Sequence, residues 1–119
     1  MNWEADLLID IILKNLHDSK ADKILNINLN GKSEQADNMV IASGTSNRHV
    51  ASIAEKLITV IKKNSKIRVK TEGIKNADWV LIDCGDIVVH VFVQEVRDFY
   101  QLERIWQYDQ KTIFESENA

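Results

Sequence analysis

The chain has 119 residues, of which 45% are hydrophobic and 28% are charged, and its net charge is −3. These values are typical of one soluble globular domain over residues 1–119, and no apolar stretch approaches the roughly 20 residues that a membrane span needs. The acidic N-terminus lacks the features of a secretory signal, so we expect a cytoplasmic protein. Cys84 is the only cysteine, which excludes an intramolecular disulfide and a cysteine-based zinc site.

The first half of the chain alternates helical and extended patterns. Apolar residues at steps of three and four predict a helix over residues 3–17. Residues 25–30 alternate apolar side chains with asparagines, which indicates a strand with one solvated face. A short apolar run at 39–42 predicts a second strand, and helical spacing predicts a second helix from Ser46 or Asn47 to Lys63.

The second half contains a hairpin and a last helix. Residues 67–71 alternate weakly and favour a short strand. Two β-branched runs, 78–83 and 87–93, flank a turn at residues 83–86 and predict an antiparallel hairpin. Phe99, Leu102, Ile105 and Trp106 mark the apolar stripe of a third helix over residues 96–108.

This element order predicts an α/β fold in which helices flank a mixed five-stranded sheet. The strand–helix–strand crossover from Met39 to Thr71 is expected to form a parallel pair, and the hairpin around Gly85 an antiparallel one.

Charge is distributed unevenly along the chain. Residues 72–103 hold seven acids and two bases, a net charge of −5. Trp79, Tyr100 and Trp106 lie in or beside this segment, and acidic surroundings with aromatic anchors favour a docking surface for a basic partner. If Phe99 is buried, its helical neighbour Tyr100 turns toward the rim, so we expect Tyr100 to be the exposed anchor.

Two motifs allow a catalytic interpretation. Asp83 and Asp86 are candidate ligands for a divalent cation, but a hairpin turn also favours aspartate for local hydrogen bonds. Residues 43–46, Ser-Gly-Thr-Ser, precede a helix as a phosphate-binding loop does, yet they lack the full glycine pattern and the lysine. We favour the turn and the helix cap in each case.

The remaining reactive side chains favour structural roles. The three histidines show no metal-ligand spacing, and His90 lies within an apolar strand, as a satisfied core histidine does. Carboxylates beside Cys84 raise a thiol pKa, which argues against a nucleophile. A basic cluster within residues 62–70 is more typical of a solvated face, so RNA contact is expected to be peripheral at most.

Four segments together resemble the ribosomal silencing factor family, also called RsfS or Iojap-like proteins. They are ADNMVIASGTSNRHVASIAEKL at 36–57, EG at 72–73, ADWVLIDCGDIVVHVF at 77–92 and RDFYQLERIW at 97–106. The resemblance implies a nucleotidyltransferase-like sheet topology without an established enzymatic role, and we expect no cofactor or metal. It also implies binding to the large-subunit ribosomal protein uL-fourteen, which keeps the ribosomal subunits apart and represses translation under nutrient limitation. Organellar relatives also serve large-subunit assembly.

The resemblance further implies a set of partner-binding residues within these segments. They are Trp79 and Tyr100, followed by Asp83, Asp86, His90, Arg97 and Glu103.

Two other hypotheses stay open from the sequence. One is a nucleotidyltransferase-like enzyme that uses the Ser-Gly-Thr-Ser loop and a magnesium ion on Asp83 and Asp86. The other is a homodimer formed by an apolar hairpin edge.

Overall fold

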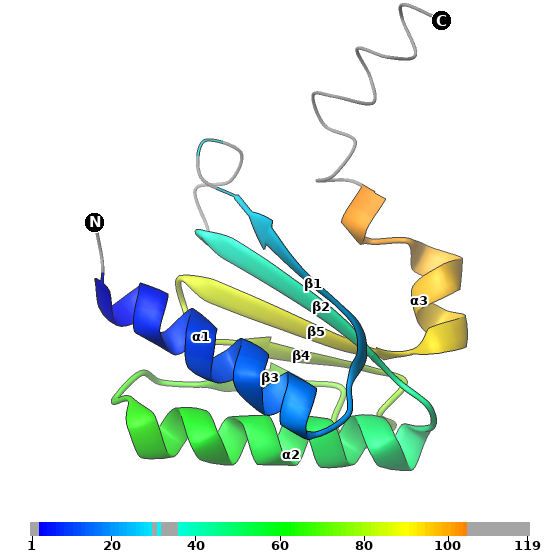
Figure 1. The fold of residues 1–119 in the computed structure, drawn as a ribbon. Helices are drawn as coiled ribbons and strands as arrows, with labels where there is room; N and C mark the ends of the chain where they lie inside the picture. Colours follow the sequence, from blue (N-terminus) through cyan, green and yellow to red (C-terminus); the bar gives the residue numbers. More distant parts are fainter. Residues whose placement is uncertain (1–2, 30, 32–35, 105–119) are drawn as a thin grey trace, which may run out of the picture.

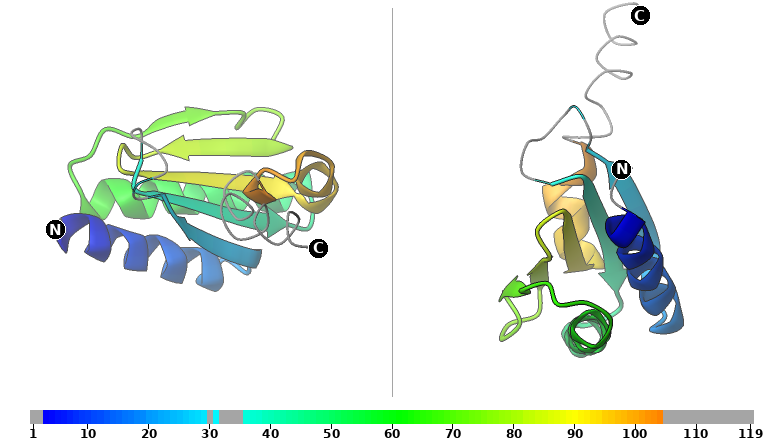
Figure 2. Two further views of the ribbon diagram at one scale, coloured as in Figure 1. Left: turned by 90° about the horizontal axis from the view of Figure 1, so that it is seen from above. Right: turned by 90° about the vertical axis from the view of Figure 1, so that its left-hand side faces the viewer.

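The computed structural model describes residues 3–29, 31 and 36–104 of the chain, and all structural statements concern these residues. They form a five-stranded mixed sheet with two long helices packed on one face and a short helix on the other (Figures 1 and 2). In chain order the elements are α1 (Trp3–Asp18), β1 (Asp22–Asn28), β2 (Asn38–Gly44), α2 (Asn47–Asn64), β3 (Lys70–Glu72), β4 (Trp79–Asp83), β5 (Ile87–Val93) and α3 (Gln94–Tyr100). None of these helices has both the length and the apolar character needed to cross a membrane.

The two long helices confirm the helical patterns of the sequence. α1 buries Leu8, Ile12 and Leu16 against the sheet and α2. α2 begins after Ser46, whose side-chain oxygen accepts a hydrogen bond from the His49 N–H at 3.1 Å. This cap satisfies one of the free amides at the start of the helix, as expected.

The strand order is β1-β2-β5-β4-β3, which corrects one expectation. β2 pairs in parallel with β5 rather than with the strand that follows α2. β3 lies at the far edge of the sheet, antiparallel to β4, and its three residues are all exposed. β5 takes the central place because its side chains are apolar on both faces, whereas the short polar β3 has none to bury there.

The hairpin around Gly85 has the predicted antiparallel pairing, but neither of its strands is at an edge. β3 covers the outer side of β4, and β2 covers that of β5. The expectation of a free apolar hairpin edge for self-pairing is therefore wrong, because within the described sheet the edge strands are β1 and β3. β1 has the predicted half-solvated pattern, in which Ile27 is buried while Asn26 and Asn28 are exposed.

The predicted third helix is interrupted after Tyr100, and Glu103 and Arg104 are helical again. Gln101 adopts a left-handed conformation with φ of 49°, and its N–H bonds the carbonyl of Arg97 at 2.8 Å. This is a common way for a helix to terminate. Phe99 is 80% exposed, so the condition under which Tyr100 was expected at the rim does not hold, although Tyr100 itself is exposed. Trp106 and the expected helical residues beyond 104 lie outside the described residues.

Candidate protein-binding surface

The sheet face opposite α1 and α2 carries most of the expected site residues. Residues paired across neighbouring strands project to the same face, so the register defines rows. Trp79 pairs with Phe92, and Phe92 pairs with Ser43. The next row runs through Leu81 and His90 to Ile41, and α3 lies beside the first row through contacts of Val96 with the cluster around Phe92.

An aromatic surface, consisting of Trp79, Phe99 and Tyr100, lies where β4 begins and α3 ends. The ring of Trp79 is half-buried and lies 5.0 Å from that of Tyr100, between centroids. Tyr100 is 55% exposed and contacts the ring of Phe99 edge to face at 5.1 Å. Trp79 also packs on the fully buried Phe92 at 4.7 Å, which fixes the surface to the core.

Two shallow hollows adjoin Trp79. One, of about 300 Å³, is lined by residues that include Asp78, Val96 and Tyr100. The other, of about 280 Å³, is lined by residues that include Leu81 and His90. Trp79 and Gly73 line both hollows, so the two hollows adjoin one another at these residues.

Gly73 is required for the position of Trp79. Its φ is +85°, and a Cβ atom there would lie 2.1 Å from the carbonyl oxygen of Trp79. The backbone at Gly73 therefore lies so close to the backbone of Trp79 that only glycine fits at this position. The next loop is fixed by Asn47, whose side-chain amide donates to the carbonyl of Asn76 at 2.9 Å and to the carboxylate of Asp78.

Arg97 is 7% exposed and anchors α3 instead of facing solvent. Its Nη1 donates to the hydroxyl of Ser43 at 2.8 Å and to the backbone carbonyl of Lys23 at 2.7 Å, and its Nε faces Glu103 at 3.4 Å. The guanidinium thus links α3 to the ends of β1 and β2. We therefore treat Arg97 and Glu103 as positioning residues and not as contact residues.

His90 has the structural role that the apolar strand indicated. Its Nδ1 accepts a hydrogen bond from the indole Nε1 of Trp79 at 2.9 Å. Burial lowers the His90 pKa from 6.5 to about 4, so the ring is neutral near pH 7. The neutral ring orients the Trp79 side chain, and its own exposed area is small.

Cys84 is buried, and its pKa is raised from 9.0 to about 11, first by burial and then by the charge of Asp83. This agrees with the predicted direction and leaves the thiol protonated near pH 7.

Asp83 and Asp86 lie at the opposite end of the sheet from Tyr100. Asp83 accepts a hydrogen bond from the Gly85 N–H at 2.8 Å, as the turn interpretation predicted. The backbone carbonyl of Asp86 receives the N–H groups of Asp37 and Asn38. These two acids are consequently outside the aromatic surface.

The Ser-Gly-Thr-Ser loop and the aspartate pair do not converge. Gly44 pairs with Val93 and Asp83 pairs with Val88, five residues apart on β5, which corresponds to about 17 Å along the strand. The loop amides are also partly engaged, since the Thr45 N–H donates to Nδ1 of His49 at 2.9 Å. The constellation required by the nucleotidyltransferase hypothesis is therefore not assembled.

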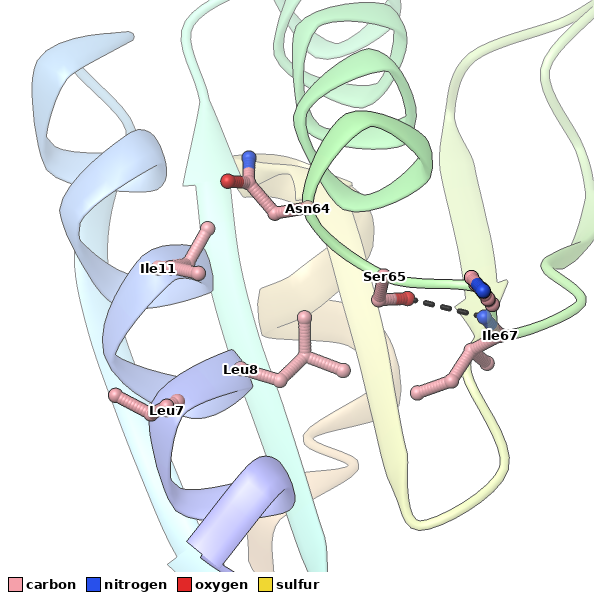
Figure 3. Close-up of a pocket in the computed structure, with 7 residues that line it drawn as sticks. Leu7, Leu8, Ile11, Asn64, Ser65 and Ile67 are labelled. Carbon is pink, nitrogen blue, oxygen red and sulfur yellow. Dashed lines mark hydrogen bonds between the residues drawn. The ribbon is translucent and has the colours of Figure 1, made fainter.

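A wider groove of about 820 Å³ lies elsewhere, between α1 and the segment that follows α2 (Figure 3). It is lined by Leu7, Leu8, Ile11, Asn64, Ser65, Lys66 and Ile67. This lining contains no carboxylate, histidine or cysteine. Among the described residues, no group of three or more such side chains is placed to hold a metal ion.

The acidic character near the aromatic surface comes from fewer residues than the sequence segment suggested. Glu72, Asp78, Glu95 and Asp98 are exposed on the elements around it. Asp98 accepts a hydrogen bond from the side chain of Gln94 at 2.7 Å and keeps its exposure. These acids give the surface a negative rim.

Sequence reasoning missed three contributors to this surface. Phe99 was interpreted as part of the apolar stripe of a helix and not as a surface residue, because a stripe cannot show where a helix leaves the sheet. Ser43 was interpreted only as part of a loop, whereas it receives Arg97. Gly73, the glycine of the EG pair, could have been found from the sequence, because a glycine next to a strand often marks a close approach of backbone.

Comparisons with known proteins identify the family. The profile of the RsfS family, described as ribosomal silencing factor during starvation, matches residues 3–119. A ribosomal silencing factor RsfS of Zymomonas mobilis is 47% identical over 105 residues, covering 88% of this chain and 79% of the relative. The mouse protein named mitochondrial assembly of ribosomal large subunit protein 1 is 34% identical over 101 residues, covering 82% of this chain and 44% of its own length.

Solved structures agree with this match. A crystal structure of a Chromobacterium violaceum protein is similar with a TM-score of 0.82 and 30% identity, covering 86% of this chain and 85% of the other. One from Bacillus halodurans has a TM-score of 0.77 and 36% identity, covering 85% and 94%. The chain belongs to the ribosomal silencing factor (RsfS) family.

Proposed function

We propose that this protein, as one domain, binds the large ribosomal subunit in the cytoplasm through its aromatic surface and prevents the small subunit from joining. The partner we propose is the large-subunit ribosomal protein uL-fourteen, and the result is repression of translation when nutrients are scarce. Membership of the RsfS family and the names of its relatives support this direction. The observation that carries it is the exposure of Phe99 and Tyr100 beside Trp79.

Exposed aromatic rings at a fixed position favour protein binding. Phe99 and Tyr100 are two of four large hydrophobic residues exposed in the described chain, and they are adjacent. Tyrosine and tryptophan are enriched among residues that dominate binding energy, and burying a whole phenylalanine side chain contributes about 2 kcal/mol. Because Trp79 rests on the core, its ring loses little conformational freedom when a partner binds.

The negative rim determines the kind of partner. Glu72, Asp78, Glu95 and Asp98 repel a phosphate backbone but attract a basic protein surface. Ribosomal proteins are mostly basic, so one of them suits the aromatic surface better than ribosomal RNA does. Opposite potentials speed the encounter, and the aromatic contacts then slow dissociation.

The proposed action does not require catalysis. A folded domain held at the face where two subunits meet occupies the volume that the second subunit needs. The separation of the Ser-Gly-Thr-Ser loop from Asp83 and Asp86 supports this non-enzymatic action.

The test is titration of purified uL-fourteen with single variants, followed by calorimetry. Phe99→Ala and Tyr100→Ala should each weaken binding by about 2 kcal/mol, or roughly thirtyfold, if they are hot spots. Leu7→Ala is the matched control, because Leu7 is also half-exposed but lies on α1, away from α3. Unchanged affinity in both aromatic variants, with circular dichroism showing a native fold, would remove this surface from the proposal.

A further inference from the structure

A second charged surface, which we name the basic end, lies away from the aromatic surface. It consists of Lys62, Lys63, Lys66, Arg68 and Lys70. Residues 62–70 contain these five cations and no acid, which leaves a net charge of −8 on the rest of the chain. All five side chains are exposed, and none forms an ion pair with another described residue.

The fold brings these cations together at one end of the sheet. Lys62 and Lys63 lie in the last turn of α2, Lys66 and Arg68 lie in the segment before β3, and Lys70 begins β3. In Figure 1 this end lies opposite α3. The Ser65 hydroxyl accepts the Ile67 N–H at 3.1 Å and so supports the turn that carries Lys66 and Arg68 (Figure 3).

The two surfaces are separated along the sheet. Lys70 pairs with Asp83, at the other end of β4 from Trp79, about 13 Å away along the strand. Asp83 lies opposite Lys70, and Glu72 follows Lys70 by two residues on β3, so acids adjoin the basic end at Lys70. Charges at the two ends of β4 are largely screened from one another at physiological salt, whereas Glu72 of the negative rim lies only two residues from Lys70 on β3.

We propose that the basic end binds the phosphate backbone of double-helical RNA. This inference rests on the proposed function, because the large subunit presents RNA helices beside its proteins. Residues 62–70 contain five cations and no aromatic side chain. Cations bind the phosphates of a duplex, whereas proteins hold single-stranded RNA by stacking its bases on aromatic side chains, so this composition favours duplex RNA. Two sites on one rigid domain then engage one particle, which raises overall affinity without strengthening either contact.

Salt dependence of binding to a short RNA duplex tests the inference directly. Each neutralised phosphate contributes to the salt slope, so Lys66→Gln/Arg68→Gln should lower the log–log slope by about 1.5 and weaken binding about tenfold at about 0.1 M salt. The control Lys14→Gln/Arg48→Gln removes the same charges from exposed positions on α1 and α2 and should leave the slope unchanged. An equal effect of both double variants would overturn the inference, as would a wild-type protein that does not bind the duplex.

A second set of measurements separates this inference from the proposed function. Lys66→Gln/Arg68→Gln should keep full affinity for isolated uL-fourteen while losing affinity for whole large subunits. Phe99→Ala/Tyr100→Ala should lose uL-fourteen and keep the RNA duplex. A wild-type protein that ignores isolated uL-fourteen but binds the duplex as predicted would contradict the proposed function alone. Binding of the basic end to phosphatidylserine vesicles and not to RNA would overturn the inference.

Discussion

Replacement of the buried Arg97 by methionine tests how α3 is held in place. Met keeps much of the apolar stem but removes the hydrogen bonds to Ser43 and to the carbonyl of Lys23, at 2.8 and 2.7 Å. Bonds from a charged donor contribute about 1.5–3 kcal/mol each, and Glu103 also loses its counter-charge. We therefore expect a loss of about 4 kcal/mol in the free energy that holds α3 on the sheet.

Urea unfolding and hydrogen exchange of the α3 amides measure this loss. Urea unfolding reports it if α3 unfolds with the whole domain, and faster exchange confined to residues 94–100 reports it if α3 detaches alone. Arg48→Met is the matched control, since this exposed helical arginine should change stability by less than about 0.5 kcal/mol. A loss below about 1 kcal/mol for Arg97→Met with unchanged α3 exchange would refute the anchoring role.

Three further predictions concern the residues around Trp79 and the hairpin. Burial lowers the His90 pKa from 6.5 to about 4, so between these pH values the unfolded chain binds one more proton than the folded chain does. The contribution of His90 to the free energy of unfolding should therefore be complete above pH ~6.5 and should fall by about 3 kcal/mol toward pH 4. His90→Gln should flatten this pH dependence in urea titrations. Gly73→Ala should lower the free energy of unfolding by about 3 kcal/mol or more in thermal unfolding, because the new Cβ would clash with the Trp79 carbonyl. The control Gly85→Ala, which has a similar φ of +84° but open space around it, should lower it by about 1–2 kcal/mol. Equal losses for the two variants would contradict the clash. Cys84, with its pKa raised to about 11, should react with a disulfide reagent at pH 8 far more slowly in the native protein than in urea, and equal rates would show that the thiol is accessible.

Local sequence patterns predicted the helices and strands well, but they did not predict which strands pair with one another. The steps of three and four that placed Leu8, Ile12 and Leu16 on one face depend only on helix geometry, and the structure confirms them. The pairing partner of β2 depends instead on which strand can bury both faces, and this requires comparing β3 with β5 across the whole chain. A crossover rule applied to consecutive strands alone therefore gave the wrong neighbour.

Two of the three aromatic residues of the candidate site were predictable, and its charged residues were not. Trp79 and Tyr100 were found from their motifs, and both contribute to the aromatic surface. Asp83 and Arg97 share the same segment but separate in space, because a strand moves successive residues along the sheet while a helix turns Arg97 inward. Proximity in the sequence thus predicted a single surface. In the fold these residues lie in three places, which are the aromatic surface, the hairpin turn with Asp83 and the buried site of Arg97.

The proposal as a whole is tested most directly by subunit joining. Separated large and small ribosomal subunits are mixed, and light scattering follows their association with and without the protein. The account predicts that wild-type protein added to the large subunit lowers the association, while Phe99→Ala/Tyr100→Ala does not and Leu7→Ala acts as wild type does. Association that proceeds fully with saturating wild-type protein bound to the large subunit would contradict it.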